Sequence, residues 1–191
     1  MGKIYCVMGK SSSGKDTVYK KLKEQYKEFR LIVPYTTRPI REGEKDGVEY
    51  YFVDPEQFRA MKEDGKVIES RSYNTKCGIW TYFTADDGQI DLSAADYLLI
   101  GTLVSYQALR EYFGEEAIVP VYLEVEDGLR LARALERERR QEKPKYAEMC
   151  RRFLADEEDF SEENLERAGI TKRFQNTDLD QVTQEIASYM K

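Results

Sequence analysis

Short apolar runs alternate with longer, more polar segments along the chain, and this alternation predicts the core of the fold. The apolar runs favour β-strands and lie at residues 4–8, 97–100, 118–125 and 170–174. The segments that follow the strands have helical spacing and lie at residues 15–28, 103–113, 127–142 and 178–190. Strands that alternate with helices form a parallel sheet covered by helices, so we expect an α/β fold.

Residues 35–90 interrupt this alternation with runs that are rich in tyrosine and threonine. These runs favour strands and lie at residues 48–53, 67–73 and 79–84. Asp54 followed by Pro55 predicts the start of a short helix, with the aspartate as its N-cap and the proline at its first position. We therefore expect a β-rich subdomain at residues 35–90, inserted into the α/β core.

A second insertion is predicted at residues 133–152, where lysine, arginine and glutamate crowd around Pro144. This pattern predicts two exposed helices or a flap, which we call the lid. The chain is then a single domain, whose core consists of residues 1–34, 91–132 and 153–191. Taken alone, the same charge pattern also fits a solvated helix face held by ion pairs between residues four apart.

The bulk composition limits the classes of partner. The chain has 191 residues and a formal net charge of −6, so broad electrostatic attraction to nucleic acid is not expected. No run approaches the roughly 18 apolar residues that are needed to cross a bilayer, and the first residues lack the pattern of a signal peptide. We expect a cytoplasmic protein that binds neither nucleic acid nor membranes.

The absence of histidine limits the chemistry further. Ser/His/Asp and Cys/His nucleophilic sites are excluded, as are metals bound by histidine. Cys6, Cys77 and Cys150 are far apart, so neither a disulfide framework nor a zinc cluster is indicated. Any chemistry is left to lysine, arginine, carboxylates, hydroxyls and backbone amides.

A glycine-rich segment joins the first predicted strand to the first predicted helix. It consists of Gly9, Lys10, Ser11, Ser12, Ser13, Gly14, Lys15, Asp16 and Thr17. The spacing of Gly9, Gly14 and Lys15 is that of a Walker A loop, whose backbone N–H groups and lysine bind the phosphates of ATP. Asp16 stands where that pattern has serine or threonine, and a hydroxyl follows at Thr17. The alternative is a glycine- and serine-rich turn with a solvated lysine, which the strand–loop–helix context disfavours.

Two arginines three residues apart, Arg38 and Arg41, form a second candidate anion site, and Tyr50 follows them on a predicted strand. An arginine fork binds two phosphate oxygens at once, and a tyrosine hydroxyl can donate one further hydrogen bond. Taken alone, two arginines in a charged loop are more often exposed to solvent than functional.

Residues 36–53 read TTRPIREGEKDGVEYYFV. Together with the phosphate loop, this segment resembles the guanylate kinase family, in which the loop is followed by T-T-R-x-x-R-x-G-E-x-x-G-x-x-Y-x-F-V. The resemblance implies a P-loop kinase fold, with a three-layer core, an inserted acceptor-binding subdomain and a helical lid. It also implies direct in-line transfer of the γ-phosphate of ATP to GMP, with Mg²⁺ as cofactor.

The same resemblance implies roles for individual residues. Those expected to act in catalysis are Lys15, Arg38, Arg133, Arg137 and Arg152. Those expected to bind the acceptor are Arg38, Arg41, Tyr50, Glu69, Trp80 and Tyr82. Glu69 would accept hydrogen bonds from N1 and N2 of guanine, and Trp80 and Tyr82 compete for one phosphate-binding position. ATP would be held by residues 9–17, with Thr17 as the candidate ligand of Mg²⁺.

The chain departs from the family pattern at three places. Pro34 stands where the family has serine, and residues 75–82 replace an N-Y-Y-G-T/S segment. Residues 99–102 read LIGT where the family has L-D-I-D, so Thr102 replaces an aspartate expected near the base and the metal. The acidic residues that could compensate are Asp86, Asp87 and Asp91.

These departures leave two alternative functions open. One is a kinase of the same fold that uses another monophosphate as acceptor. The other is a catalytically silent guanylate-kinase-like module that binds peptides. The silent module is disfavoured because the lysine and the glycines of the phosphate loop are intact.

Overall fold

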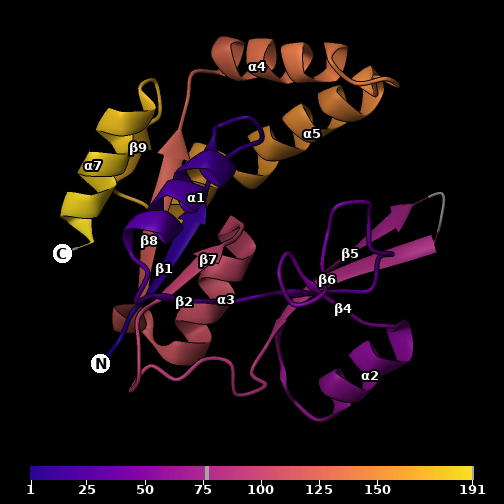
Figure 1. Ribbon diagram of the computed structural model, residues 1–191, viewed down its shortest axis with the longest axis vertical. Coiled ribbons are helices and arrows are strands. Elements are labelled where there is room, and N and C mark those ends of the chain that lie inside the picture. Colours follow the sequence, from indigo (N-terminus) through magenta and orange to yellow (C-terminus); the bar gives the residue numbers. More distant parts are fainter. Residues whose placement is uncertain (76–77, 191) are drawn as a thin grey trace.

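The core of the computed structural model is a five-stranded parallel sheet, on the left of Figure 1. The structure describes residues 1–75 and 78–190, without the side chain of Thr75. The strand order is β2-β7-β1-β8-β9, and the paired strands run parallel. The strands are β1 (Ile4–Met8), β2 (Arg30–Leu31), β7 (Tyr97–Ile100), β8 (Ile118–Glu124) and β9 (Arg173–Gln175).

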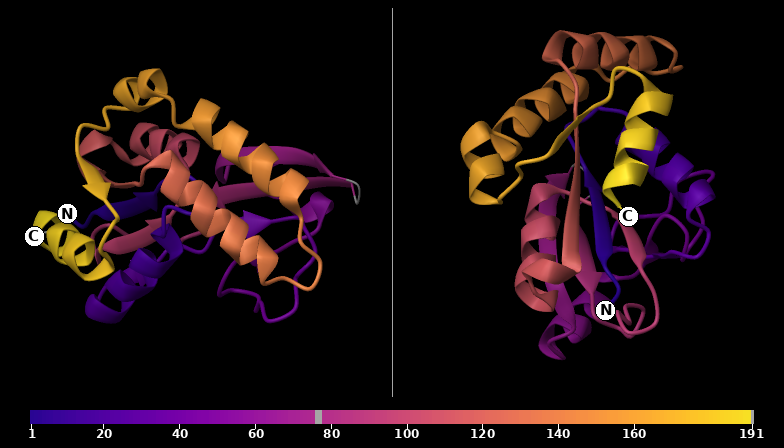
Figure 2. Two further views of the ribbon diagram at one scale, coloured as in Figure 1. Left: turned by 90° about the horizontal axis from the view of Figure 1, so that it is seen from above. Right: turned by 90° about the vertical axis from the view of Figure 1, so that its left-hand side faces the viewer.

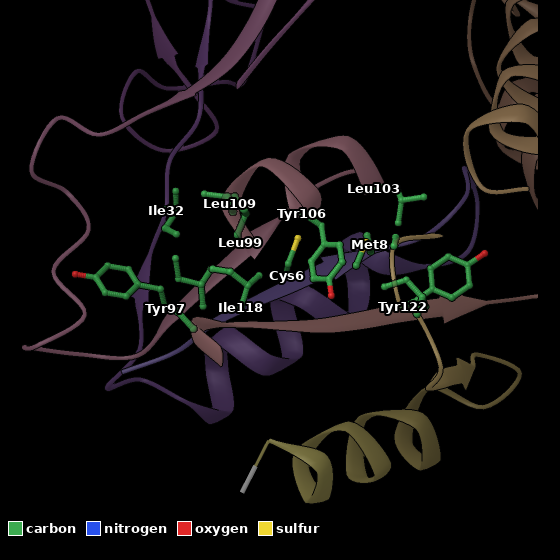
Figure 3. Close-up of a cluster of buried hydrophobic side chains, with 14 of the residues drawn as sticks. Cys6, Met8, Ile32, Tyr97, Leu99, Leu103, Tyr106, Leu109, Ile118 and Tyr122 are labelled. Atoms are coloured by element: carbon green, nitrogen blue, oxygen red, sulfur yellow. The ribbon is translucent and has the colours of Figure 1, made fainter. Parts of the chain in front are cut away.

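Helices cover both faces of this sheet, which confirms the predicted three-layer α/β core. They are α1 (Lys15–Gln25) and α7 (Leu179–Tyr189) on one face, and α3 (Leu103–Phe113) and α6 (Glu162–Arg167) on the other. The alternation of side chains along β1 explains the two layers of contacts. Tyr5 and Val7 pack toward α1 and α7, whereas Cys6 and Met8 belong to the cluster at α3 that Figure 3 shows.

Most of the predicted core elements are present, and the errors lie at their ends. The helix predicted at 15–28 ends at Gln25, because Tyr26 leaves the helix and its ring stacks on that of Phe29 at 4.8 Å. The chain then enters β2, which the sequence did not predict. The strand predicted at 170–174 begins only at Arg173, since the Ile170 amide donates to the Leu165 carbonyl at the end of α6. The last predicted helix is one residue shorter at each end.

A second sheet, on the right of Figure 1, has the strand order β4-β3-β6-β5. Its strands are β3 (Tyr35–Thr36), β4 (Tyr51–Phe52), β5 (Val67–Thr75) and β6 (Gly78–Ala85). Between β4 and β5 lies α2 (Pro55–Glu63), which begins with the predicted cap, since Asp54 accepts from the amides of Glu56 and Gln57. The β-rich nature of this region is therefore confirmed.

Strand β4 is shorter than the sequence predicts. Residues 47–49 form a turn instead, closed by a bridge between Asp46 and Tyr50, and carboxylates accept from backbone N–H groups on both sides of it. Asp46 accepts from the Phe52 amide at 2.7 Å, and Glu49 accepts from the Lys45 amide at 2.8 Å. This turn leads the chain back from the Arg38 loop to Tyr50.

Two long helices, α4 (Asp127–Arg139) and α5 (Tyr146–Asp159), pack against each other and lie above the core in Figure 1 and in front of it in the left view of Figure 2. A connection that contains Pro144 joins them, as predicted for the lid. Both helices extend beyond the predicted range of 133–152, so their ends reach the core sheet. Within residues 1–75 and 78–190, no helix is both long and apolar enough to cross a membrane. A cytoplasmic location stays a prediction.

Candidate functional site

The loop between β1 and α1 has a backbone that only particular residues can adopt. Gly14 caps α1 with a φ of 84°, and a Cβ atom there would lie 2.4 Å from the amide nitrogen of Asn176. That amide donates to the Ser13 carbonyl at 2.7 Å, so Asn176 fixes the loop from the neighbouring segment after β9. Ser12 also has a positive φ, of 63°, which is unfavourable for a residue other than glycine. Sequence reasoning missed Asn176, because only the fold brings it to the loop.

The loop is shaped to receive an anion. It ends at the N-terminus of α1, where backbone N–H groups point outward and the helix dipole favours negative charge. The hydroxyls of Ser12 and Ser13 are buried, and neither has a hydrogen-bond partner within the described part of the chain. Buried hydroxyls are normally paired, so both remain available to a bound ligand.

A cavity of about 430 Å³ opens beside this loop. It is lined by Ser12, Gly14, Asp16, Thr17, Arg133, Arg137, Asn176, Thr177 and Leu179. The structure therefore brings two of the three predicted lid arginines to the phosphate loop. Arg133 also donates to the Asn176 carbonyl at 3.3 Å. Arg152 lies apart, exposed on α5, where its Nε donates to Glu148 at 2.9 Å.

The first residues of the loop are bound to the lid rather than left open. Lys10 forms an ion pair with Glu157 of α5 at 2.8 Å, and the Ser11 amide donates to Asp156 at 2.7 Å. Arg130 of α4 is 1% exposed and donates to both the Ser11 carbonyl and Glu157. This network joins both lid helices to the loop. It was not predicted, because α5 approaches the loop only in the folded chain.

Arg38 is held in place by an acidic neighbour. It is 3% exposed, and both of its terminal nitrogens donate to the carboxylate of Glu44, at 2.7 and 2.6 Å. Its guanidinium carbon lies 5.0 Å from the centre of the Tyr50 ring and 5.2 Å from that of Phe52. The Nε of Arg38 is buried and has no hydrogen-bond partner among the described residues. Glu44 lies within residues 36–53, the segment from which the site was predicted, but sequence reasoning assigned no role to it.

This ion pair makes the free energy of unfolding depend on pH in the acidic range. The Arg38 guanidinium lowers the pKa of Glu44 from 4.5 to about 2. Because the folded state resists protonation of Glu44, its contribution is complete above the unfolded pKa and is lost as the pH falls toward 2. We expect Glu44→Gln to remove up to about 3 kcal/mol of this pH dependence of the unfolding free energy. Denaturant titrations at several pH values measure it, with Glu42→Gln as the control. Equal pH slopes in wild type and Glu44→Gln would refute the coupling.

The other acceptor candidates lie unequally close to Arg38. The Tyr50 ring packs edge-on against the Tyr82 ring, with centres 5.6 Å apart, and burial raises the pKa of the Tyr50 hydroxyl. Trp80 is half-buried two residues earlier on β6, so Tyr82 is the better placed of the two competing candidates. The Arg41 side chain is exposed, although its amide donates to Glu44. Lys76 and Cys77, in the altered segment 75–82, lie outside the described residues.

Glu69 lies on β5 and is 9% exposed, and its two carboxylate oxygens differ in their hydrogen bonding. Oε1 accepts from the Thr84 hydroxyl at 3.0 Å, whereas Oε2 is buried and accepts no hydrogen bond from the described residues. The Nε of Arg71 lies 3.4 Å from Oε2, and Nη1 of Arg71 donates to the Thr102 hydroxyl at 2.7 Å. Sequence reasoning missed Arg71, although its position two residues after Glu69 places it on the same face of the strand.

The three aspartates that could have compensated for Thr102 have other partners. Asp86 accepts from the Tyr112 hydroxyl at 2.9 Å, and Asp87 accepts from the Tyr35 hydroxyl. Asp91 accepts from the hydroxyl of Ser93 at 2.6 Å. Over residues 1–75 and 78–190, no group of three acidic or cysteine side chains is arranged to hold a metal ion by itself.

Comparison with known proteins agrees with this geometry in the N-terminal part. Residues 1–79 match the family model described as guanylate kinase. This part of the chain is guanylate kinase-like. A guanylate kinase from Legionella pneumophila is 47% identical over 68 residues, which cover 36% of this chain and 32% of that protein. One from Frankia casuarinae is 49% identical over 61 residues, covering 32% of this chain and 33% of that protein. The matched region thus spans about a third of each relative.

The fold likeness extends over the whole chain. A crystal structure of guanylate kinase from Anaplasma phagocytophilum superposes with a TM-score of 0.64 over 99% of this chain and 84% of that one, at 22% identity. An uncharacterized protein from Eubacterium ventriosum gives a TM-score of 0.50 at 15% identity. The likeness to the Anaplasma phagocytophilum structure confirms the P-loop kinase fold. Glu69 and the Arg38 loop lie within residues 1–79, which match the family model, whereas the lid and Thr102 lie outside them.

Proposed function

We propose that the protein transfers the γ-phosphate of ATP to GMP. The observation that supports the proposal is that one fold carries two candidate anion sites: the phosphate loop beside Arg133 and Arg137, and the cluster of Arg38 and Tyr50. Glu69 lies on β5, which pairs with the strand that carries Tyr82, and its Oε2 accepts no hydrogen bond from the described residues. Such an arrangement suits a kinase that binds a nucleoside triphosphate and a nucleoside monophosphate together.

The two sites are linked through the central strand. Nη1 of Arg71 donates to the Thr102 hydroxyl just after β7, and the Gly101 amide donates to the Val7 carbonyl of β1. Strand β1 leads directly into the phosphate loop. Arg71 therefore lies near the carboxyl ends of β1 and β7, the edge at which α/β folds bind ligands.

In this proposal each group has a defined task. The loop amides and Lys15 bind the β- and γ-phosphates, and Arg133 and Arg137 neutralise charge that develops during transfer. Arg38, Arg41 and Tyr50, with Tyr82 or Trp80, hold the acceptor phosphate. Closure of α4 and α5 would exclude water and bring Arg152 into use. No covalent intermediate is required.

The residues present at the loop fit a magnesium ion carried by the nucleotide. The Thr17 hydroxyl and the Asp16 carboxylate are exposed at the first turn of α1 and line the same cavity. Oxygen donors of this kind are the ligands that Mg²⁺ prefers, and the ion usually keeps phosphates and water as its other ligands. When bound, Mg²⁺ would supply charge neutralisation at the phosphates. Thr17, with Asp16 beside it, would hold it.

A steady-state assay of ATP with GMP, AMP, IMP, CMP and UMP tests the proposal. We expect ADP formation with GMP at a kcat/KM far above those of the other four nucleotides. A clear preference for another monophosphate would favour a same-fold kinase with a different acceptor, which Pro34 and Thr102 also suit. Absence of ADP formation with every acceptor would favour a silent binding module. That alternative is less favoured because the loop residues are intact.

Arg38 provides a second test. We expect Arg38→Ala to raise the KM for GMP and lower kcat about 10²-fold, because an arginine that binds phosphate has no substitute among neutral side chains. The KM for ATP should change little. Arg59→Ala removes an exposed arginine of α2 and is the control. A loss of ATP affinity as large as that of GMP affinity would place Arg38 at the donor site instead.

A further inference from the structure

A buried donor and a buried acceptor lie side by side in the candidate acceptor site. Oε2 of Glu69 and Nε of Arg71 form an ion pair at 3.4 Å, but within the described residues neither takes part in a hydrogen bond. Buried polar groups are rarely left unpaired. The pair therefore presents one acceptor and one donor, in adjacent positions, to a ligand.

The orientation of Arg71 is fixed from its far end. Nη1 donates at 2.7 Å to the hydroxyl of Thr102, which is the N-cap of α3 and itself accepts from the Ser105 amide. The side chain of Arg71 is 25% exposed, although its Nε is buried. Arg71 thus joins β5 of the second sheet to the N-terminus of α3.

We propose that Arg71 determines base specificity by donating to the 6-oxo group of guanine, next to the N1 and N2 groups that Glu69 would bind. This inference rests on the proposed function. Guanine carries two donors followed by a carbonyl acceptor along one edge, and Glu69 followed by Arg71 is the complementary sequence of groups. Adenine carries an amino donor in place of the carbonyl, so Arg71 would face a donor with a donor.

The test compares GMP with 6-thio-GMP, whose sulfur is a weaker acceptor while N1–H and the 2-amino group are retained. For the wild-type protein, we expect kcat/KM to be about 10- to 100-fold higher with GMP, because hydrogen bonds to charged groups are worth one or two powers of ten. Arg71→Met should lower kcat/KM for GMP by a similar factor and bring the ratio between the two acceptors close to one. Arg71→Lys, which keeps a cationic donor, should restore part of the preference.

Two controls separate base reading from structural support. The ratio of GMP to IMP reports on the 2-amino group and therefore on Glu69, so Arg71→Met should leave it unchanged. Arg59→Met makes the same substitution at an exposed arginine of α2 and should leave both ratios unchanged. Binding of GMP without ATP can be followed by the fluorescence of Trp80, the only tryptophan of the chain.

The outcomes distinguish this inference from the function on which it rests. If GMP is phosphorylated but the wild-type protein uses 6-thio-GMP equally well, Arg71 does not read the base, and the kinase assignment stands. The same holds if Arg71→Met weakens both acceptors by one factor, because that result indicates structural support alone. If the wild-type protein does not turn over GMP, the proposed function fails and this inference fails with it. Should Arg71→Met not fold, the ratio of kcat/KM for GMP to that for 6-thio-GMP, measured in the wild-type protein and in Arg71→Lys, still shows whether Arg71 contacts the 6-oxo group.

Discussion

Replacement of Lys15 by alanine is expected to lower phosphoryl transfer to any acceptor by about 10³-fold or more. The lysine stands at the end of the phosphate loop, at the start of α1, where its ammonium group would contact the β- and γ-phosphates. Charge that develops on these oxygens during transfer is stabilised by preorganised positive groups, and single groups of this kind contribute factors of about 10² to 10³ or more.

The fold should tolerate this substitution. The Lys15 ammonium lies 4.0 Å from the exposed carboxylate of Asp16, and exposed ion pairs contribute little to stability. We therefore expect the free energy of unfolding to change by about 0.5 kcal/mol or less. Lys20→Ala, one turn further along the same helix on its exposed side, is the matched control for activity and stability.

Two measurements make the result decisive. Steady-state rates with ATP and GMP show the loss of activity, and denaturant unfolding shows that the variant is folded. Near-normal turnover by folded Lys15→Ala would mean that the loop does not bind the transferred phosphate, and the kinase proposal would then lose its donor site.

The core could be predicted because its signals are local. Strand β1 is an uninterrupted apolar run, the glycines of the loop have fixed spacing, and the Asp54–Pro55 pair marks the start of α2. Each signal depends on neighbours in sequence, so no tertiary contact was needed to interpret it. The errors fall where tertiary contacts decide the end of an element, as at Tyr26, whose ring stacks on Phe29 instead of continuing α1.

The candidate site was predicted in part, and the missing residues share one property. Each of them holds or positions a group through a contact that only the folded chain makes. These residues are Glu44, Arg71, Asn176 and Arg130. Arg130, for example, lies just before the predicted lid and had no assigned role, yet its side chain is buried and donates to the Ser11 carbonyl 119 residues away. Only the fold could show this contact. Arg152 was grouped with Arg133 and Arg137, but in this structure it lies apart from them, exposed on α5 and paired with Glu148, so its catalytic role stays a prediction.

Replacement of Glu69 is expected to have the second large effect, on the choice of base. Glu69→Ala should reduce the preference for GMP over AMP by about 10⁴-fold while the KM for ATP stays nearly unchanged. Oε2 of Glu69 is buried and accepts no hydrogen bond within the described residues, so it would accept from the N1 and N2 groups of guanine. Sites built on such hydrogen bonds reject analogues that lack the donors by factors of about 10⁴ to 10⁵.

IMP separates the two hydrogen bonds to Glu69. It keeps the N1 hydrogen and lacks only the 2-amino group, so it should lose one charged hydrogen bond, worth about 1.5 to 3 kcal/mol. The wild-type protein should therefore place IMP between GMP and AMP, and Glu69→Ala should bring IMP and GMP close together. Glu63→Gln, on the exposed side of α2, is the control for the general effect of losing a carboxylate.

The opposite outcome has a clear physical meaning. If folded Glu69→Ala keeps the preference for GMP over AMP and IMP, the open oxygen of Glu69 does not face a base. The ion pair with Arg71 would then be a structural link between β5 and α3, through Thr102. The acceptor would in that case be chosen by its phosphate alone, through Arg38 and Tyr50, and a kinase with another monophosphate acceptor would explain the site better than a guanylate kinase.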